Sequence, residues 1–134
     1  MAEELREQVP LMKDVLKAMG IRLIEKAGLE ADDLIGTLSR RCEEAGMDVV
    51  VLSGDRDLLQ LATKKVKIRI PKTKGGRTEV EDYLAADVKE KYQVTPQEFI
   101  DVKALMGDTS DNIPGGAKYR REDGDENHCG IPND

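Results

Sequence analysis

Tryptophan is absent from this 134-residue chain, and aromatic residues make up only 3% of it. The hydrophobic core is therefore expected to be aliphatic. The two cysteines, Cys42 and Cys129, are too few for a disulfide framework and form no metal-ligand motif. The chain also lacks a secretory signal and any apolar run long enough to cross a membrane, so a cytoplasmic location is expected.

Histidine is nearly absent as well. The one histidine, His128, lies in an irregular polar segment, and no serine or cysteine stands in a pattern that suggests an activated nucleophile. The net charge of −6 argues against a protein that binds nucleic acid by bulk positive charge alone. It does not exclude a nuclease, because carboxylates that bind metal ions count as negative until the ions arrive.

Carboxylates gather at three places where helices or strands are expected to begin or end. They are Glu30, Asp32 and Asp33, then Asp55 and Asp57, then Asp108 and Asp111. Crowded carboxylates repel one another, and a hard divalent cation such as Mg²⁺ or Mn²⁺ relieves that repulsion. Two such ions about 4 Å apart can activate water and stabilise the leaving oxygen in phosphodiester cleavage.

Each acidic group also has a structural interpretation. Acidic residues in the first turn of a helix are favoured by the helix dipole, which applies to the first group. Asp55 could be a turn residue and Asp57 an N-cap. Asp108 and Asp111 could accept backbone hydrogen bonds in a loop. The occurrence of all three groups at expected element ends favours the metal site.

Apolar periodicity predicts strands alternating with helices. Helices are expected over 2–19, with Pro10 interrupting it or marking its start, and over 30–45, 58–62, 80–92 and 96–106; strands are expected over 21–24, 49–52, 66–70 and 78–80. This order indicates an α/β fold with a mainly parallel sheet flanked by helices. The apolar run 49–52 is typical of a strand buried on both faces. Ligands of such sheets bind beyond the carboxyl ends of the strands, so the first two acidic groups are expected to converge.

One basic zone stands out in this acidic chain. Residues 58–78 contain no Asp or Glu but include seven basic residues. Lys72, Lys74 and Arg77, near the expected turn, are the candidates for contact with DNA phosphates. A solvated hairpin is the alternative interpretation.

Three blocks of the sequence resemble a known family. They are Glu30-Ala31-Asp32-Asp33-Leu34-Ile35-Gly36, Ser53-Gly54-Asp55-Arg56-Asp57, and Leu105-Met106-Gly107-Asp108-Thr109-Ser110-Asp111-Asn112-Ile113-Pro114-Gly115. In this order and spacing they are similar to the 5′ nuclease (5′-3′ exonuclease) domain of bacterial DNA polymerase I, in the PIN-like, flap endonuclease superfamily. The resemblance covers about residues 1–115.

The resemblance implies a PIN-like (Rossmann-like, resolvase-like) fold and metal-dependent hydrolysis of DNA at 5′ ends and flaps, as in primer removal and repair. It implies two ions, Mg²⁺ or Mn²⁺. Glu30, Asp32 and Asp33 would serve the first metal cluster, Asp55 and Asp57 would complete or bridge it, and Asp108 and Asp111 would lean toward the second metal. The implied protein is a monomer away from membranes, with a polymerase domain following in the complete protein.

Two departures from the family predict an incomplete domain. The family places a strand with another aspartate, and a basic arch, before the region where Met1 begins. After Gly115 the family continues with a turn such as Gly-Val-Pro-Gly-Ile-Gly-Glu-Lys-Thr, which opens a helix-hairpin-helix; here Gly116-Ala117-Lys118-Tyr119 does not match. Residues 1–115 are therefore expected to be a partial exonuclease domain, truncated at both ends, and the fragment to be weak or inactive.

The tail over 116–134 is expected to be frameshifted text. A choice of synonymous codons exists for which removal of one base after the codon of Gly115 restores Gly-Val-Pro-Ser-Ile-Gly-Glu-Lys-Thr and an amphipathic helix. Two other functions stay open: a PIN-like enzyme acting on RNA, and a non-catalytic module that binds branched nucleic acid or metal. A non-functional truncated product is the third alternative.

Overall fold

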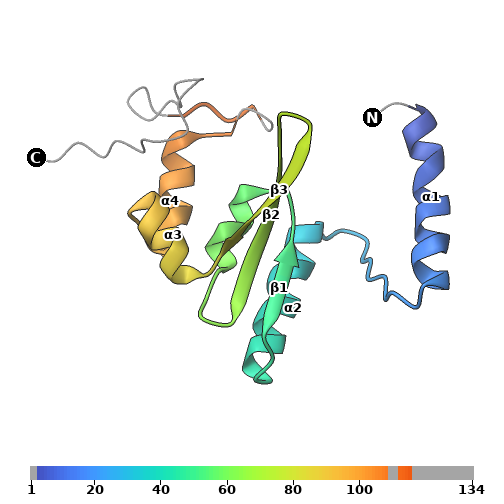
Figure 1. Ribbon diagram of the computed structural model, residues 1–134, viewed down its shortest axis with the longest axis horizontal. Helices are drawn as coiled ribbons and strands as arrows, with labels where there is room; N and C mark the ends of the chain where they lie inside the picture. Colours follow the sequence, from blue (N-terminus) through green and yellow to red (C-terminus); the bar gives the residue numbers. More distant parts are fainter. Residues whose placement is uncertain (1–2, 109–111, 116–134) are drawn as a thin grey trace, which may run out of the picture. The chain divides into compact units, whose positions relative to one another are not determined.

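The computed structural model describes residues 3–108 and 112–115 (Figure 1). The chain divides into two compact units, Met1–Leu34 and Ile35–Asp134. The boundary falls inside the first turn of a helix, α2, which spans Ala31–Glu44. Within the described ranges, no helix is both long and apolar enough to cross a membrane.

The first unit is built around α1, Glu3–Ala18. The expected helix is confirmed, and Pro10 lies inside it rather than at its start. Lys13 of α1 forms an ion pair with Glu25 in the segment that follows. The strand expected over 21–24 is wrong, because these residues are irregular. A strand needs a hydrogen-bonded neighbour, and the described first unit contains no other strand.

The second unit contains a three-stranded sheet in the order β1-β2-β3. The strands are β1, Val49–Leu52, β2, Val66–Lys74, and β3, Arg77–Tyr83. β1 and β2 are parallel, whereas β2 and β3 form an antiparallel hairpin, so the sheet is mixed. β3 is longer than expected, and the helix expected from residue 80 begins only at Ala85, because residues 77–83 pair with β2 instead.

The hairpin turns at Gly75 and Gly76, whose φ angles are +58° and +78°. Positive φ at both central residues suits the right-handed twist of a tight hairpin, and glycine adopts it without steric cost. The turn therefore lies at the position predicted from the sequence.

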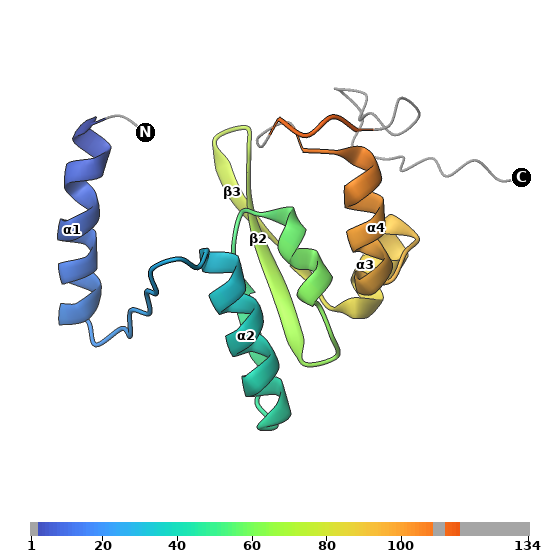
Figure 2. The same cartoon turned by 180° about the vertical axis from the view of Figure 1, so that it is seen from behind.

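Three further elements cover one face of the sheet. They are the 3₁₀ helix η1, Arg56–Leu61, and the helices α3, Ala85–Tyr92, and α4, Pro96–Met106. Figures 1 and 2 both show α3 and α4 side by side, with η1 between them and the strands. Thr95 and Glu98 form the expected capping box at the start of α4, and Gly107 ends that helix.

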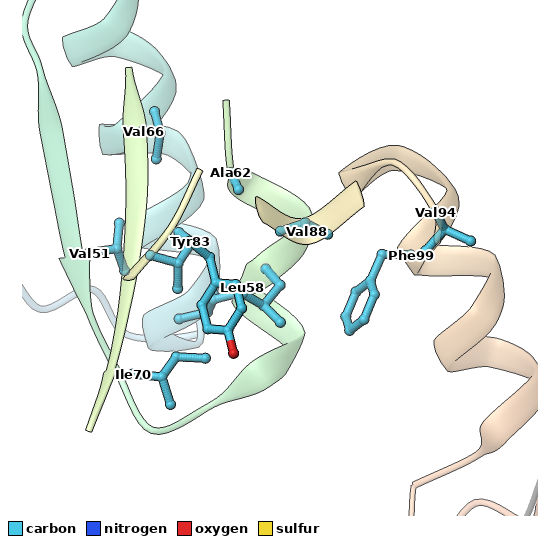
Figure 3. Packing of buried hydrophobic residues seen from close by; sticks show 11 residues of the cluster. Val51, Leu58, Ala62, Val66, Ile70, Tyr83, Val88, Val94 and Phe99 are labelled. Atoms are coloured by element: carbon cyan, nitrogen blue, oxygen red, sulfur yellow. The ribbon is translucent and has the colours of Figure 1, made fainter. Parts of the chain in front are cut away.

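The core of the second unit lies between the sheet and these helices (Figure 3). Leu59, Ile68, Val66 and Val88 are its largest fully buried side chains, which confirms the aliphatic expectation in part. Aromatic residues contribute more than expected. The ring centroids of Tyr92 and Phe99 are 5.2 Å apart in an edge-on contact, and those of Tyr83 and Tyr92 are 6.4 Å apart.

The other face of the sheet corrects one expectation. Val51 is buried at 7% exposure, but Val50 and Leu52 are 56% and 66% exposed. The expectation that β1 is buried on both faces is therefore wrong for the described residues. Successive side chains of a strand point to opposite faces, and η1, α3 and α4 all pack on the face of Val51.

Candidate metal centre

The loop after β1 places the second acidic group. The backbone N–H of Asp55 donates to Oγ of Ser53 at 3.1 Å, and the N–H of Asp57 donates to Oδ1 of Asp55 at 2.9 Å. Asp55 is thus the N-cap of η1, the role that the sequence suggested for Asp57. Its side chain is exposed beyond the carboxyl end of β1.

Asp57 is held from another element. Its Oδ1 lies 2.8 Å from Nζ of Lys103, which comes from α4 and is 24% exposed. The sequence analysis missed Lys103. A signal existed, because Lys103 is four residues after the buried Phe99 and so lies on the buried side of its helix, where an unpaired lysine is rare. This ion pair fixes the Asp57 carboxylate against α4.

The first acidic group lies at the start of α2. The N–H of Glu30 donates to Oδ2 of Asp33 at 3.2 Å, which supports the helix-start interpretation for Asp33. Asp32 is exposed in the first helical turn. These three residues belong to the first unit, whereas Asp55 and Asp57 belong to the second, so the expected convergence of the two groups stays a prediction.

The third acidic group is described only in part. Asp108 and Ile113 exchange two backbone hydrogen bonds, of 2.9 Å and 2.7 Å, which close the expected loop. Asp108 is half-buried, and Asp111 lies outside the described residues. The tail over 116–134, with its frameshift hypothesis, lies outside them too.

The donor set suits a hard divalent cation. Carboxylates are the ligands that Mg²⁺ and Mn²⁺ prefer, and Asp55 and Asp57 stand two residues apart at a strand end. Over residues 3–108 and 112–115, no three or more Asp, Glu, Cys or His side chains gather closely enough to hold an ion by themselves. The ligand set expected from the sequence therefore stays a prediction.

A polar cluster around Glu81 lies beside the loop that contains Asp55 and Asp57, and it was not predicted from the sequence. We call it the Glu81 cluster; its members are Arg56, Lys72, Glu81, Tyr83, Lys91 and Tyr92. Oε1 of Glu81 lies 3.0 Å from Nζ of Lys72, and Oε2 lies 3.4 Å from Nζ of Lys91. Tyr83 donates its hydroxyl hydrogen to Oε2 of Glu81. The members come from η1, both strands of the hairpin and α3, so no local motif marks them.

Glu81 is anionic in this setting. Its partial burial raises the pKa, but the hydrogen bonds from Tyr83 and Lys72 and the charge of Lys91 outweigh burial and lower the pKa to about 2. Three cations thus surround one carboxylate. The cluster carries net positive charge next to the loop of Asp55 and Asp57.

The basic zone is partly used within the hairpin. Lys72 pairs with Glu81, and Lys67 and Arg69 both pair with Asp82, the latter through two hydrogen bonds of 2.7 Å and 2.8 Å. Lys74 and Arg77 lie opposite each other next to the turn, and the Arg77 side chain is exposed. Contact of Lys72, Lys74 and Arg77 with DNA stays a prediction.

Comparison with known proteins supports the family resemblance seen in the sequence motifs. Residues 1–93 match the family described as 5′-3′ exonuclease, N-terminal resolvase-like domain. The chain is 52% identical over 112 residues to DNA polymerase I of Bacillus caldotenax and to that of Bacillus subtilis strain 168, covering 84% of this chain and 12% of each relative. The chain therefore spans about an eighth of the length of these relatives.

A solved structure confirms the expected α/β, resolvase-like fold. The T5 D15 protein, co-crystallized with metal ions, superposes with a TM-score of 0.66 at 30% identity, over 86% of this chain and 44% of that one. The family match covers well over half of the chain. The chain belongs to the family of 5′-3′ exonuclease N-terminal, resolvase-like domains.

Proposed function

We propose that this chain is part of a metal-dependent 5′-3′ exonuclease and flap endonuclease that hydrolyses DNA phosphodiester bonds. One observation carries the proposal: in a chain of this family, Asp55 and Asp57 stand directly beyond the carboxyl end of β1, each in a defined contact. Ligands of α/β sheets bind at such strand ends.

The metal-binding part of the proposal assigns Mg²⁺ or Mn²⁺ to the seven carboxylates. These are Glu30, Asp32, Asp33, Asp55, Asp57, Asp108 and Asp111. When bound, two such ions activate water and stabilise the leaving oxygen of the phosphodiester. The chain's own contribution is orientation: the η1 cap fixes Asp55, and Lys103 fixes Asp57.

The substrate part of the proposal rests on the relatives. Both are named DNA polymerase I, and the matched family is a 5′-3′ exonuclease domain, which supports DNA with 5′ ends or flaps as the proposed substrate, as in primer removal during replication and in repair. Lys72, Lys74 and Arg77 would contact its phosphates. A polymerase domain would follow in the complete protein, and the isolated 134-residue chain would be monomeric and weakly active or inactive.

The test begins with Mn²⁺ binding to the 134-residue chain, measured by water-proton relaxation. Asp55→Asn is the informative variant, because asparagine caps a helix about as well as aspartate and removes only the charge. We expect its affinity for Mn²⁺ to fall about tenfold, equivalent to about 1.4 kcal/mol. Asp48→Asn, at the other end of β1, is the matched control and should bind Mn²⁺ like the wild type.

Cleavage assays with a 5′-flap DNA and a single-stranded RNA complete the test. Slow, Mn²⁺-dependent cleavage of the flap that Asp55→Asn abolishes supports the proposal. Preference for the RNA would favour a ribonuclease. If Asp55→Asn changes neither nucleic-acid binding nor Mn²⁺ binding, a non-catalytic module is favoured and the proposal is contradicted.

A further inference from the structure

Three cations from three elements converge on one carboxylate in the Glu81 cluster. Arg56 of η1, Lys72 of β2 and Lys91 of α3 each pair with Glu81, at distances of 3.8, 3.0 and 3.4 Å. A second acidic residue, Glu79, lies opposite Lys72 in the hairpin. The cations outnumber the carboxylates even when Glu79 is counted. Like charges held close together repel one another, and an added anion relieves that repulsion.

The hydrogen-bond donors of this cluster are only partly used. Nη1 of Arg56 donates to the Tyr92 hydroxyl at 2.6 Å, which is the one hydrogen bond that this guanidinium donates to a described residue. Nη2 lies 3.8 Å from Oε2 of Glu81, beyond hydrogen-bond distance. The Tyr92 hydroxyl accepts from Arg56, so its own hydrogen is left to donate, and it has no acceptor within the described ranges. Unused donors of this kind suit an anion.

Lys91 brings a second cation close to the same tyrosine. Its Nζ lies 5.9 Å from the centroid of the Tyr92 ring and donates to the Tyr83 hydroxyl at 2.6 Å. The side chains of Arg56 and Lys91 are 26% and 35% exposed, so both are held by protein contacts and still reach solvent. Side chains that are already ordered lose less conformational entropy when a ligand binds.

The position of these residues in the fold suits a ligand of the sheet. Arg56 follows the carboxyl end of β1, and Lys72 lies near the carboxyl end of the parallel strand β2. Ligands of α/β sheets bind beyond this edge. The proposed function already places DNA phosphates at Lys72. Phosphate oxygens accept charge-assisted, often bidentate hydrogen bonds from a guanidinium.

We propose that Arg56, Lys91 and the Tyr92 hydroxyl form a subsite that binds one backbone phosphate of DNA. Arg56 supplies charge and the donors of its planar fork, Tyr92 supplies a hydroxyl donor, and Lys91 supplies further charge. This inference rests on the proposed function, because it concerns the substrate proposed there. It does not depend on a bound metal ion, so it can be tested without one.

Two simpler effects must be separated from a phosphate contact. Removal of any cation makes the chain more negative, which weakens DNA binding through space. Removal of Arg56 could also loosen the contact between η1 and α3 without any role in binding. A lost phosphate contact has its own signature, because fewer counterions are released: the slope of log affinity against log salt becomes shallower by about 0.9.

The experiment measures binding of a labelled 5′-flap DNA to the full 134-residue chain by fluorescence anisotropy, in EDTA and at KCl concentrations from about 50 to 200 mM. We expect Arg56→Met to weaken binding and to make the salt slope shallower by about 0.9. Tyr92→Phe should weaken binding without changing the slope, because it removes a donor and no charge.

Arg69→Met is the matched control. It removes the same charge from the opposite face of the sheet, where Arg69 pairs with Asp82. It should leave the salt slope as in the wild type.

The outcomes that overturn the inference are distinct from failure of the proposed function. If the wild type binds DNA and Arg56→Met leaves the slope unchanged, the inference alone fails. Equal changes of slope in Arg56→Met and Arg69→Met also overturn it, because they would assign the effect to bulk charge. Unchanged affinity in Tyr92→Phe contradicts the subsite as stated. Absence of DNA binding by the wild type overturns the proposed substrate and this inference together.

Circular dichroism shows whether Arg56→Met folds. If it does not, Lys91→Met takes its place, because it removes the second cation of the subsite and leaves the contact between Arg56 and Tyr92 intact. A shallower salt slope in Lys91→Met than in Arg69→Met supports the inference. Equal slopes in these two variants contradict it.

Discussion

A single carboxylate connects several elements of this fold. Glu81 is bound by cations from η1, β2 and α3, and its pKa is lowered to about 2 from an ordinary value of 4.5. The ionised form is therefore favoured in the folded protein relative to the unfolded chain. Because the pKa of Glu81 differs between the folded and unfolded states, the free energy of unfolding depends on pH.

The first prediction concerns that dependence. Because the pKa is lowered on folding, the stabilising contribution of Glu81 is complete above about pH 4.5 and disappears as the pH falls toward 2. We expect Glu81→Gln to reduce the free energy of unfolding more at pH 7 than at pH 2.5, by on the order of 1 to 2 kcal/mol after solvent screening. Urea titrations followed by circular dichroism measure it.

Comparing the wild type with Glu81→Gln isolates the contribution of Glu81 to the pH dependence of stability. The pKa values of Glu25, Asp82 and Glu98 are lowered as well, but they affect the wild type and the variant alike. A difference between the two proteins that is the same at both pH values would contradict the prediction.

Individual roles were only partly predictable from sequence. Asp55 was recognised as a turn residue, and its cap follows from local spacing alone. Glu81 and Lys103 were missed, because their partners come from segments distant in the chain. Local patterns specify caps and turns, whereas an ion pair between elements depends on how those elements pack.

The boundaries of helices and strands show the same difference between local patterns, which were predicted, and pairing between elements, which was not. The Thr95 capping box and the glycine turn of the hairpin were predicted and are confirmed, because both depend on residues within a few positions. The strand expected over 21–24 is wrong, since a strand also needs a partner. The boundary between β3 and α3 was missed because pairing with β2 outweighs the helical periodicity of 80–84.

The second prediction concerns the end of α4. Gly107 has a φ of +72°, and a Cβ there would overlap the backbone N of Gly115 and stand 2.5 Å from the carbonyl oxygen of Ile113. Gly107→Ala should therefore open the bridge between Asp108 and Ile113 and lower the free energy of unfolding by about 2 to 4 kcal/mol. Faster hydrogen exchange of the Ile113 amide reports the opening.

A second glycine supplies the matched control. Gly46 has a similar φ of +84°, but a Cβ there meets nothing within 4 Å. Gly46→Ala thus pays only for the unfavourable backbone conformation, about 1 to 2 kcal/mol, and should leave the exchange of Ile113 unchanged. Equal effects of the two substitutions would show that the close approach to Gly115 does not matter.

Across the whole chain, the class of fold was predictable but the layering was not. Alternation of strands and helices predicted the α/β class, which the comparison with the T5 protein confirms. The continuous apolar run of β1 predicted burial on both faces, yet only the face of Val51 is covered in the described second unit. Composition indicates how much apolar surface a strand has, but the coverage of that surface depends on other segments.

The third prediction uses this asymmetry. Leu59 is fully buried in the core of the second unit, whereas Leu52 is 66% exposed on β1. Leu59→Ala should lower the free energy of unfolding by about 2 to 5 kcal/mol through lost burial and a new cavity. Leu52→Ala should change it by less than about 0.5 kcal/mol. Denaturant titration measures both, and equal losses would contradict the assignment of the core.

The aromatic contacts of Tyr83, Tyr92 and Phe99 have a consequence for the fluorescence of the protein. With no tryptophan in the chain, its near-ultraviolet emission comes from tyrosine, and Tyr83 and Tyr92 both have hydroxyls in the Glu81 cluster. Emission of a phenol is quenched when its hydroxyl donates to a carboxylate. Replacing Tyr119 with phenylalanine removes the remaining emitter, so the natural fluorescence of the chain becomes a label-free reporter of the contacts beside the candidate metal centre.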